Sequence, residues 1–145
     1  MFCLRFDKSK MSFSERLLIY TDGSCQPNPG PGGYGIVVVN HSEGEWHISG
    51  GEDNKTTNNR MELTAVIEAL KFAHDFKRVK IVSDSTYVIK CAKGEWSRGS
   101  NSDLWREYEK VSKGKDIAWE WVKGHSGDKY NEIVDFLAKQ EVKKK

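Results

Sequence analysis

Two short apolar runs, each followed closely by an aspartate, constrain the fold of this chain most. Leu17–Tyr20 and Val79–Val82 have the length and composition of buried strands, and an amphipathic helical pattern lies between them. Asp22 and Asp84 are therefore expected at the carboxyl ends of strands. Carboxylates gathered there repel one another unless a cation neutralises them, and Mg²⁺ prefers such hard oxygen ligands. The sequence thus predicts a divalent-metal site.

The rest of the chain repeats the same two kinds of pattern. Strands are predicted at 15–22, 34–39, 45–50, 79–83 and 117–122, and helices at 58–73, 85–93, 102–112 and 128–141. A Gly/Pro-rich turn over 23–33 joins the first two strands. Strands joined by turns pair antiparallel, whereas strands joined through helices pair parallel. The prediction is an α/β fold with a five-stranded mixed sheet, three antiparallel strands and then two parallel strands, flanked by helices.

Glu62 lies on the most clearly predicted helix. Leu63, Val66, Ile67 and Leu70 recur at the spacing of one buried helical face. At 100° per residue, Glu62 falls about 80–90° from the middle of that stripe. Its carboxylate is therefore expected at the edge of the buried face, where it can lean over the end of a neighbouring sheet.

Length and composition favour one domain. Residues 15–142 are expected to form it, after an N-terminal extension, residues 1–14, that shows no periodicity and is expected to be loosely attached. Hydrophobic residues make up 37% of the chain, and no apolar run approaches the ~20 residues of a membrane span. No secretory signal is recognisable. The three cysteines lack metal-ligand spacing and suit reduced thiols, so a cytoplasmic location is expected.

The net charge says little about partners. The formal charge of +2 is nearly neutral, so any surface that binds nucleic acid must be local. No feature indicates a membrane or an obligate protein partner, and a monomer is expected.

Six motifs occur in a recognisable order between Leu18 and Gln140. They are Tyr-Thr-Asp-Gly-Ser-Cys, Asn-Pro-Gly-Pro-Gly-Gly-Tyr-Gly, Thr-Thr-Asn-Asn-Arg-Met-Glu-Leu, Ser-Asp-Ser, Trp-Glu-Trp-Val-Lys-Gly-His and Asn-Glu-x-x-Asp. Each alone is weak, since Asp-Gly-Ser is also a common turn. Together they resemble the type 1 ribonuclease H family. The resemblance implies the ribonuclease H fold and endonucleolytic hydrolysis of the RNA strand of RNA–DNA hybrids, with 5′-phosphate and 3′-hydroxyl products.

The resemblance also implies that four carboxylates hold two Mg²⁺ ions, with Mn²⁺ as the alternative, around the scissile phosphate. They are Asp22, Glu62, Asp84 and Asp135. In two-metal hydrolysis one ion lowers the pKa of the attacking water and the other stabilises the leaving oxygen. Taken singly, Asp22 and Asp84 would be read equally well as turn-forming residues. Four acids in one pattern make that alternative weak.

His125 lies between Gly124 and Gly127, after the last predicted strand. In the family the matching histidine assists proton transfer and product departure, and an imidazole that titrates near neutral pH suits that catalytic role. From this residue alone, an ordinary surface-loop histidine is the alternative.

The RNA strand is marked by its 2′-hydroxyl groups, which carboxamides and backbone groups can recognise. The resemblance assigns this role to Asn28, Asn58 and Asn59, with close backbone approach at Gly23 and Cys25. Local roles are alternatives, with Asn28 in a turn and Asn58 as a helix N-cap.

The DNA strand is implied to bind through a phosphate pocket. Thr57 and Asn101 match the family pocket, aided by Lys55 or Arg60. Neutral donors such as the first two position a nucleic-acid backbone without reading its sequence.

The chain departs from the family pattern in two places. Between Trp96 and Asp103 it has only Ser-Arg-Gly-Ser-Asn-Ser, whereas many bacterial members insert a longer basic helix and loop that grips the hybrid. Fewer phosphates would be neutralised, so weaker binding and a shallower salt dependence are expected. Thr86 stands where several relatives carry glutamine, so hydrogen bonding near the site is expected to be reduced.

The tryptophans give a weaker signal. Trp119 and Trp121 share one face of the last predicted strand with Ile117, and core packing is favoured over base stacking. Trp96 is one position out of register with a family tryptophan that lines the DNA channel, so its role is left open.

Other functions fit parts of the pattern. Transposases, integrases and resolvases use related folds but differ in acid spacing and lack the Thr-Thr-Asn-Asn-Arg-Met-Glu block. A hybrid-binding module without catalysis is expected to lack one of the acids, and none is missing. A domain from a larger polymerase also fits the motifs, although the leading Met and the extra N-terminal residues favour a free-standing protein.

Overall fold

A mixed sheet of five strands organises the residues that this computed structural model describes, 16–40 and 44–144. The elements in chain order are β1 (Leu17–Cys25), β2 (Gly30–Asn40), β3 (Gly44–Thr56), α1 (Asn58–Phe72), β4 (Arg78–Ser83), α2 (Thr86–Ala92), α3 (Ser102–Ser112), β5 (Asp116–Trp121) and α4 (Lys129–Lys143). The predicted N-terminal extension, residues 1–14, lies outside the described residues. Among the described helices, none combines the length and the apolar character needed to cross a membrane.

The pairing of the strands confirms the predicted sheet. Their order is β3-β2-β1-β4-β5. β1 pairs with β2, and β2 with β3, in antiparallel fashion, while β1 with β4 and β4 with β5 are parallel. β1, which carries Asp22, and β4, which ends just before Asp84, are therefore neighbours within the sheet.

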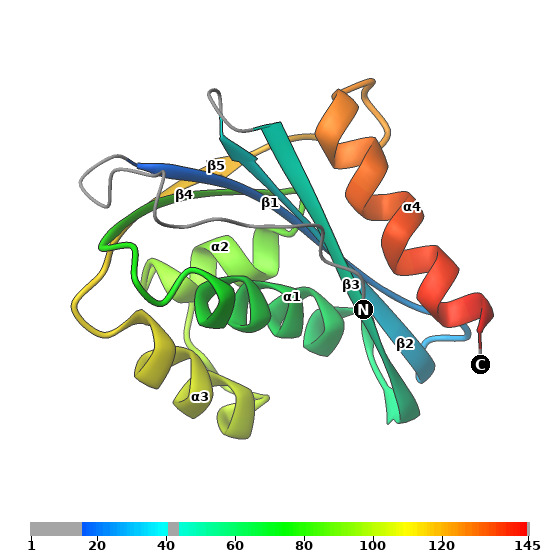
Figure 1. The fold of residues 1–145 in the computed structure, drawn as a ribbon. Coiled ribbons are helices and arrows are strands. Elements are labelled where there is room, and N and C mark those ends of the chain that lie inside the picture. Colours follow the sequence, from blue (N-terminus) through cyan, green and yellow to red (C-terminus); the bar gives the residue numbers. More distant parts are fainter. Residues whose placement is uncertain (1–15, 41–43, 145) are drawn as a thin grey trace.

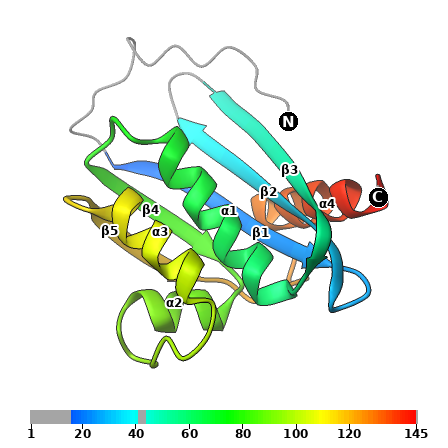
Figure 2. The same cartoon turned by 90° about the horizontal axis from the view of Figure 1, so that it is seen from below.

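Helices cover both faces of this sheet. The helices α1, α2 and α3 lie on one face, and α4 crosses the other, as Figures 1 and 2 show from two directions. β1 serves both layers, since Leu17 and Ile19 belong to the larger core under α1, while Leu18 and Tyr20 pack toward α4. Side chains alternate across a strand, so a strand covered on both faces reads as one continuous apolar run. That explains the run that follows Arg16.

The register between β1 and β4 determines where Asp22 and Asp84 lie relative to each other along the strand direction. Tyr20 pairs with Val82 in this parallel ladder. The same register continued by two residues brings Asp22 level with Asp84. The two aspartates thus lie side by side, Asp22 within β1 and Asp84 one residue after the end of β4.

The glycine-rich segment is more regular than predicted. β1 runs on to Cys25 and β2 begins at Gly30, so most of the predicted turn over 23–33 is strand. β3 likewise extends to Thr56, past its predicted end at residue 50. Glycine is a poor strand former, but here α4 packs closely over β2: a Cβ added at Gly35 would lie 2.6 Å from the carbonyl oxygen of Val134.

The core interpretation of the two tryptophans holds for one of them. Trp119 packs partly buried against the larger core. Trp121 is 53% exposed, so its assignment to the core was wrong. It is the last residue of β5, which is an edge strand.

Candidate active site

Three predicted acids converge at the carboxyl end of the central strands. Asp22 comes from β1, Glu62 from the first turns of α1, and Asp84 from the residue after β4. One carboxylate oxygen from each of the three lies within 4.8 Å of those of the other two. Asp22 is buried, while the other two are partly exposed. Residues far apart in sequence therefore form one cluster that opens to solvent on one side.

The backbone of Gly23 joins two of these acids. Its N–H donates to Oδ1 of Asp22 at 2.9 Å and to Oε1 of Glu62 at 3.0 Å. A Cβ at this position would clash with the backbone of Met61 and Glu62. Only glycine lets β1 and α1 approach so closely. Gly23 thus has a structural role at the site in addition to the predicted substrate contact, which stays a prediction.

The loop that carries Asp84 is fixed from both sides. The backbone N–H of Ser85 donates to Oγ of Ser83 at 3.0 Å, and Oγ of Ser85 caps α2 by accepting from the N–H of Val88 at 3.1 Å. The indole Nε1 of Trp121 donates to the carbonyl oxygen of Asp84 at 3.1 Å. The exposed tryptophan therefore holds the backbone of an acid in the cluster.

The acids are electrostatically strained without a cation. Burial, followed by the charge of Asp84, raises the pKa of Asp22 to about 8. Burial and the charge of Asp22 also raise the pKa of Glu62 well above its usual value, and burial with Asp135 raises the pKa of Asp84. A bound cation would favour the charged form of each group. The donor set and its charge therefore fit a hard divalent metal.

Asp135 lies apart from the close cluster. It is on α4, and its side chain is 21% exposed and paired with Nζ of Lys139 at 3.1 Å. Its charge nevertheless contributes to the raised pKa of both Asp22 and Asp84. The structure thus brings three of the four predicted ligands together and the fourth into electrostatic reach.

His125 lies in the loop between β5 and α4, as predicted. Its φ of 56° is left-handed, which is unusual for a residue other than glycine. The side chain is 68% exposed, and its Nδ1 lies 3.9 Å from Oε1 of Glu132. The imidazole therefore projects into solvent, where it can be reached by a substrate.

The predicted RNA-side asparagines gather at the start of α1. Oδ1 of Asn28 accepts from the backbone N–H of Asn58 at 3.3 Å, and Asn28, Asn58 and Asn59 are all exposed. The N-cap of α1 is Thr57, whose Oγ1 accepts from the N–H of Arg60 at 3.2 Å. The alternative role of Asn58 as N-cap was therefore wrong by one residue.

Cys25 is turned inward. Its thiol lies within hydrogen-bond distance of the carbonyl oxygens of Pro27, Gly30 and Thr56, at 3.2, 3.2 and 3.3 Å. These contacts tie the loop between β1 and β2 to the end of β3. Any contact of Cys25 with a substrate is thus left to its backbone, as the sequence suggested.

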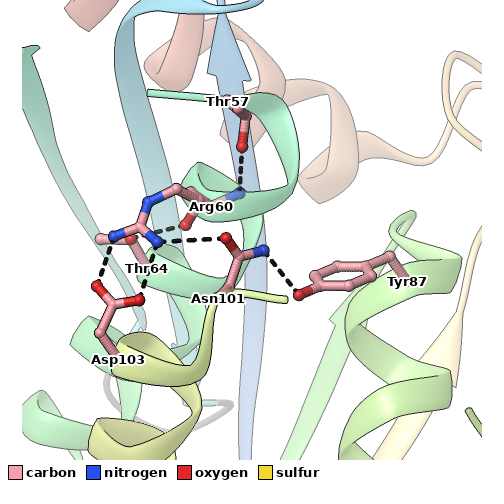
Figure 3. Close-up of polar contacts among 6 residues, drawn as sticks. All are labelled: Thr57, Arg60, Thr64, Tyr87, Asn101 and Asp103. Carbon is pink, nitrogen blue, oxygen red and sulfur yellow. Dashed lines mark hydrogen bonds and ion pairs between the residues drawn. The ribbon is translucent and has the colours of Figure 1, made fainter. Parts of the chain in front are cut away.

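The predicted phosphate pocket includes partners that the sequence did not reveal. Arg60 donates to Oδ1 of Asn101 at 3.2 Å and forms an ion pair with Asp103, and Nδ2 of Asn101 donates to the hydroxyl of Tyr87 at 2.9 Å (Figure 3). Thr57 lies at the other end of Arg60. An acid in the first turn of a helix such as α3 usually only complements the helix dipole, so Asp103 gave no signal of this contact.

The remaining predicted positions are solvent-accessible. Lys55 is exposed near the end of β3, and Thr86 is the exposed first residue of α2. Trp96 is 49% exposed in the short segment between α2 and α3. No contact of these residues in the described part of the chain bears on their predicted roles.

Comparisons with known proteins agree with this geometry. The RNase H family model matches residues 14–143. The curated ribonuclease H of Anaplasma marginale is 46% identical over 144 residues, covering 90% of this chain and 92% of the relative. The crystal structure of RNase H1 from the archaeon Halobacterium salinarum has a TM-score of 0.73 and 30% identity, covering 90% of this chain and all of that one. LC11-RNase H1 in complex with an RNA/DNA hybrid shares the fold, with a TM-score of 0.76, 21% identity, and coverage of 89% of this chain and 98% of that one.

Proposed function

This chain belongs to the type 1 ribonuclease H family, and from that premise we propose that it cuts the RNA strand of RNA–DNA hybrids by metal-dependent hydrolysis. The family makes the protein a ribonuclease. The observation that carries the finer proposal is the cluster of Asp22, Glu62 and Asp84, whose oxygens lie within 4.8 Å of one another. In the proposed reaction a water oxygen attacks phosphorus and the bond to the 3′-oxygen breaks, leaving 5′-phosphate and 3′-hydroxyl ends.

Two Mg²⁺ ions are the proposed cofactors, with Mn²⁺ as the alternative. Asp22, Glu62, Asp84 and Asp135 would hold them, and the raised pKa of Asp22 and Glu62 supports a cationic partner for the cluster. Bound ions would supply an activated water and stabilise the charge on the leaving oxygen. His125, exposed on its loop, is proposed to move a proton as the 3′-oxygen leaves.

The two strands of the hybrid are proposed to meet different parts of the surface. Exposed Asn28, Asn58 and Asn59, beside the cluster's helix α1, are suited to 2′-hydroxyl groups of RNA. Thr57 and Asn101, on either side of Arg60, are suited to a phosphate of the DNA strand. We further propose a monomeric, cytoplasmic enzyme, and the two buried free cysteines of the described chain support the cytoplasmic location.

The test compares three labelled duplexes of one sequence, an RNA–DNA hybrid, double-stranded RNA and double-stranded DNA, each with Mg²⁺ or with a chelator. Cleavage of the RNA strand is expected only in the hybrid with Mg²⁺, and ligation or phosphatase treatment of the products should reveal 5′-phosphate ends. Cleavage of all three duplexes alike, or cleavage that survives the chelator, would contradict the proposal. The Asp22→Asn protein serves as the control for contaminating nucleases, because it should bind the hybrid without cutting it.

A further inference from the structure

The guanidinium group of Arg60 forms an ion pair with Asp103. Its Nη1 and Nη2 donate to Oδ1 and Oδ2 of Asp103 at 3.0 and 2.7 Å (Figure 3). Such a fork-to-fork pair fixes the plane of the guanidinium group. The pair holds the pKa of Asp103 to about 2, so the acid is charged at any working pH. Arg60 therefore carries little net charge toward a phosphate.

The same guanidinium fixes one end of the Asn101 side chain. Arginine can only donate, so the atom of Asn101 that lies 3.2 Å from Nη1 must be the oxygen, Oδ1. The opposite end, Nδ2, donates to the hydroxyl of Tyr87 at 2.9 Å. That hydroxyl also accepts from Nε1 of the buried Trp105 at 3.0 Å. Both ends of the carboxamide thus have one allowed orientation.

The backbone conformation of Asn101 also accompanies this orientation of its side chain. Asn101 is the N-cap of α3, yet its φ of 61° and ψ of 36° are left-handed and its side chain makes no capping hydrogen bond. An N-cap asparagine ordinarily satisfies an N–H of its own helix. Here the side chain points to Arg60 and Tyr87 instead, which come from α1 and α2. One Nδ2 hydrogen remains for an outside acceptor.

We propose that Asp103 is a positioning residue, which holds Arg60 so that Arg60 orients the carboxamide of Asn101 instead of binding the DNA-strand phosphate itself. The phosphate would then meet oriented neutral donors. This inference rests on the proposed function, because it names how the DNA strand is held in that reaction. Tyr87 completes the arrangement from the other end of the carboxamide.

The first test asks whether the charge of Arg60 touches the substrate. In Arg60→Gln, KM for the hybrid should rise about three- to tenfold as Asn101 loses its orientation, with kcat unchanged. The slope of log KM against log salt should stay that of the wild type. Each cation that contacts a phosphate contributes about one unit to this slope. A slope that falls by about one unit would identify Arg60 as a phosphate ligand and overturn the inference.

The second test releases the charge of Arg60. In Asp103→Asn the salt slope should steepen by about one unit, since the guanidinium becomes free to reach a phosphate. Asp103→Glu keeps the ion pair and should retain the wild-type KM and slope. Asp116→Asn is the matched control: it breaks another arginine–aspartate pair, Arg16 with Asp116 at 2.9 Å, and makes the same change in net charge at the start of β5, away from the acids. It should leave both parameters unchanged.

The outcomes separate the two proposals. A wild-type protein that does not cut the hybrid contradicts the proposed function. A wild-type protein that cuts it, with Asp103→Asn equal to Asp116→Asn in KM and slope, overturns only the role of Asp103. Melting temperatures identify any variant that fails to fold. Because the Asp103 side chain is 57% exposed, both Asp103 and Arg60 variants are expected to fold, and either one alone decides the question.

Discussion

Asp22 shows what a single buried acid does to stability and activity. Its pKa of about 8 in the folded chain lies far above the usual 3.8. Between these two values the folded state keeps a proton that the unfolded state has lost, so stability without metal should fall as pH rises from about 4 to 8. Asp22→Asn removes the contribution of Asp22 to this dependence.

The Asp22→Asn protein should therefore be inactive but more stable than the wild type by about 1–2 kcal/mol at pH 8 in chelator. The gain should shrink at pH 5, where the wild-type carboxyl is protonated in the folded state. Thermal unfolding at the two pH values measures both effects. If Asp22→Asn melts at the wild-type temperature at pH 8, or cleaves near the wild-type rate, the assignment of Asp22 to the proposed metal site is contradicted.

A second prediction concerns the single residue His125. Alanine is strained at the left-handed φ of 56°, whereas asparagine tolerates it. His125→Asn should therefore slow cleavage by about 10²-fold without unfolding the loop, and metal binding measured by calorimetry should be retained. His74→Asn is the control, because His74 is 70% exposed at the opposite end of the sheet. A normal rate for His125→Asn would make it an ordinary loop histidine.

β1 and α1 approach each other closely at Gly23, and a substitution there can test this contact between the two elements. A methyl group at Gly23 would meet the backbone of α1, so Gly23→Ala should push the helix and Glu62 away from the strand. We expect a loss of about 1–3 kcal/mol in stability and a large loss of cleavage. Gly99→Ala, where nothing lies within 4 Å of the added Cβ, should change neither. Denaturant unfolding and the hybrid assay compare the two proteins.

Elements whose apolar residues recur at a regular spacing could be predicted from the sequence. Element ends that depend on packing against neighbouring elements could not. The helix α1 was predicted over 58–73 and spans Asn58–Phe72, because its buried face repeats every three to four residues. The carboxyl end of β1 and the start of β2 were missed, since glycine has no local strand signal and is required there by the packing of α1 over Gly23 and of α4 over Gly33 and Gly35. The exposure of Trp121 depends on what covers β5, which no pattern within the strand records.

The distribution of charge over the whole molecule predicts a shallow salt dependence. Five lysines line a hollow at the amino ends of β4 and β5, opposite the acids: Lys71, Lys77, Lys110, Lys113 and Lys115. The segment between α2 and α3, where many relatives carry a basic insertion, is short here. These five lysines therefore lie away from the proposed substrate side.

The dissociation constant of the inactive Asp22→Asn protein for a labelled hybrid, measured from about 50 to 200 mM salt, tests this distribution. The slope should be shallower than that of an insertion-bearing relative measured in parallel. Equal slopes would mean that other cations of this chain replace the insertion.

At this scale the candidate site was predictable in part. The four acids could be named because each lies in its own short motif, and three of them meet. The ion pair of Arg60 with Asp103 could not, since the two residues are 43 positions apart and neither has a local pattern that points to the other. Contacts between helices of one layer arise only once the sheet has brought α1 and α3 together.

Because Trp121 is hydrogen-bonded to the backbone of Asp84, the intrinsic tryptophan fluorescence of the protein can report on the acid cluster. An indole that is half in solvent and hydrogen-bonded to the backbone of Asp84, a proposed metal ligand, should change its emission when a cation draws the acids together. Titration with Mg²⁺ should therefore shift the intrinsic fluorescence, and Trp121→Phe should abolish that response while the other four tryptophans remain. Occupancy of the site can then be followed without substrate, label or turnover.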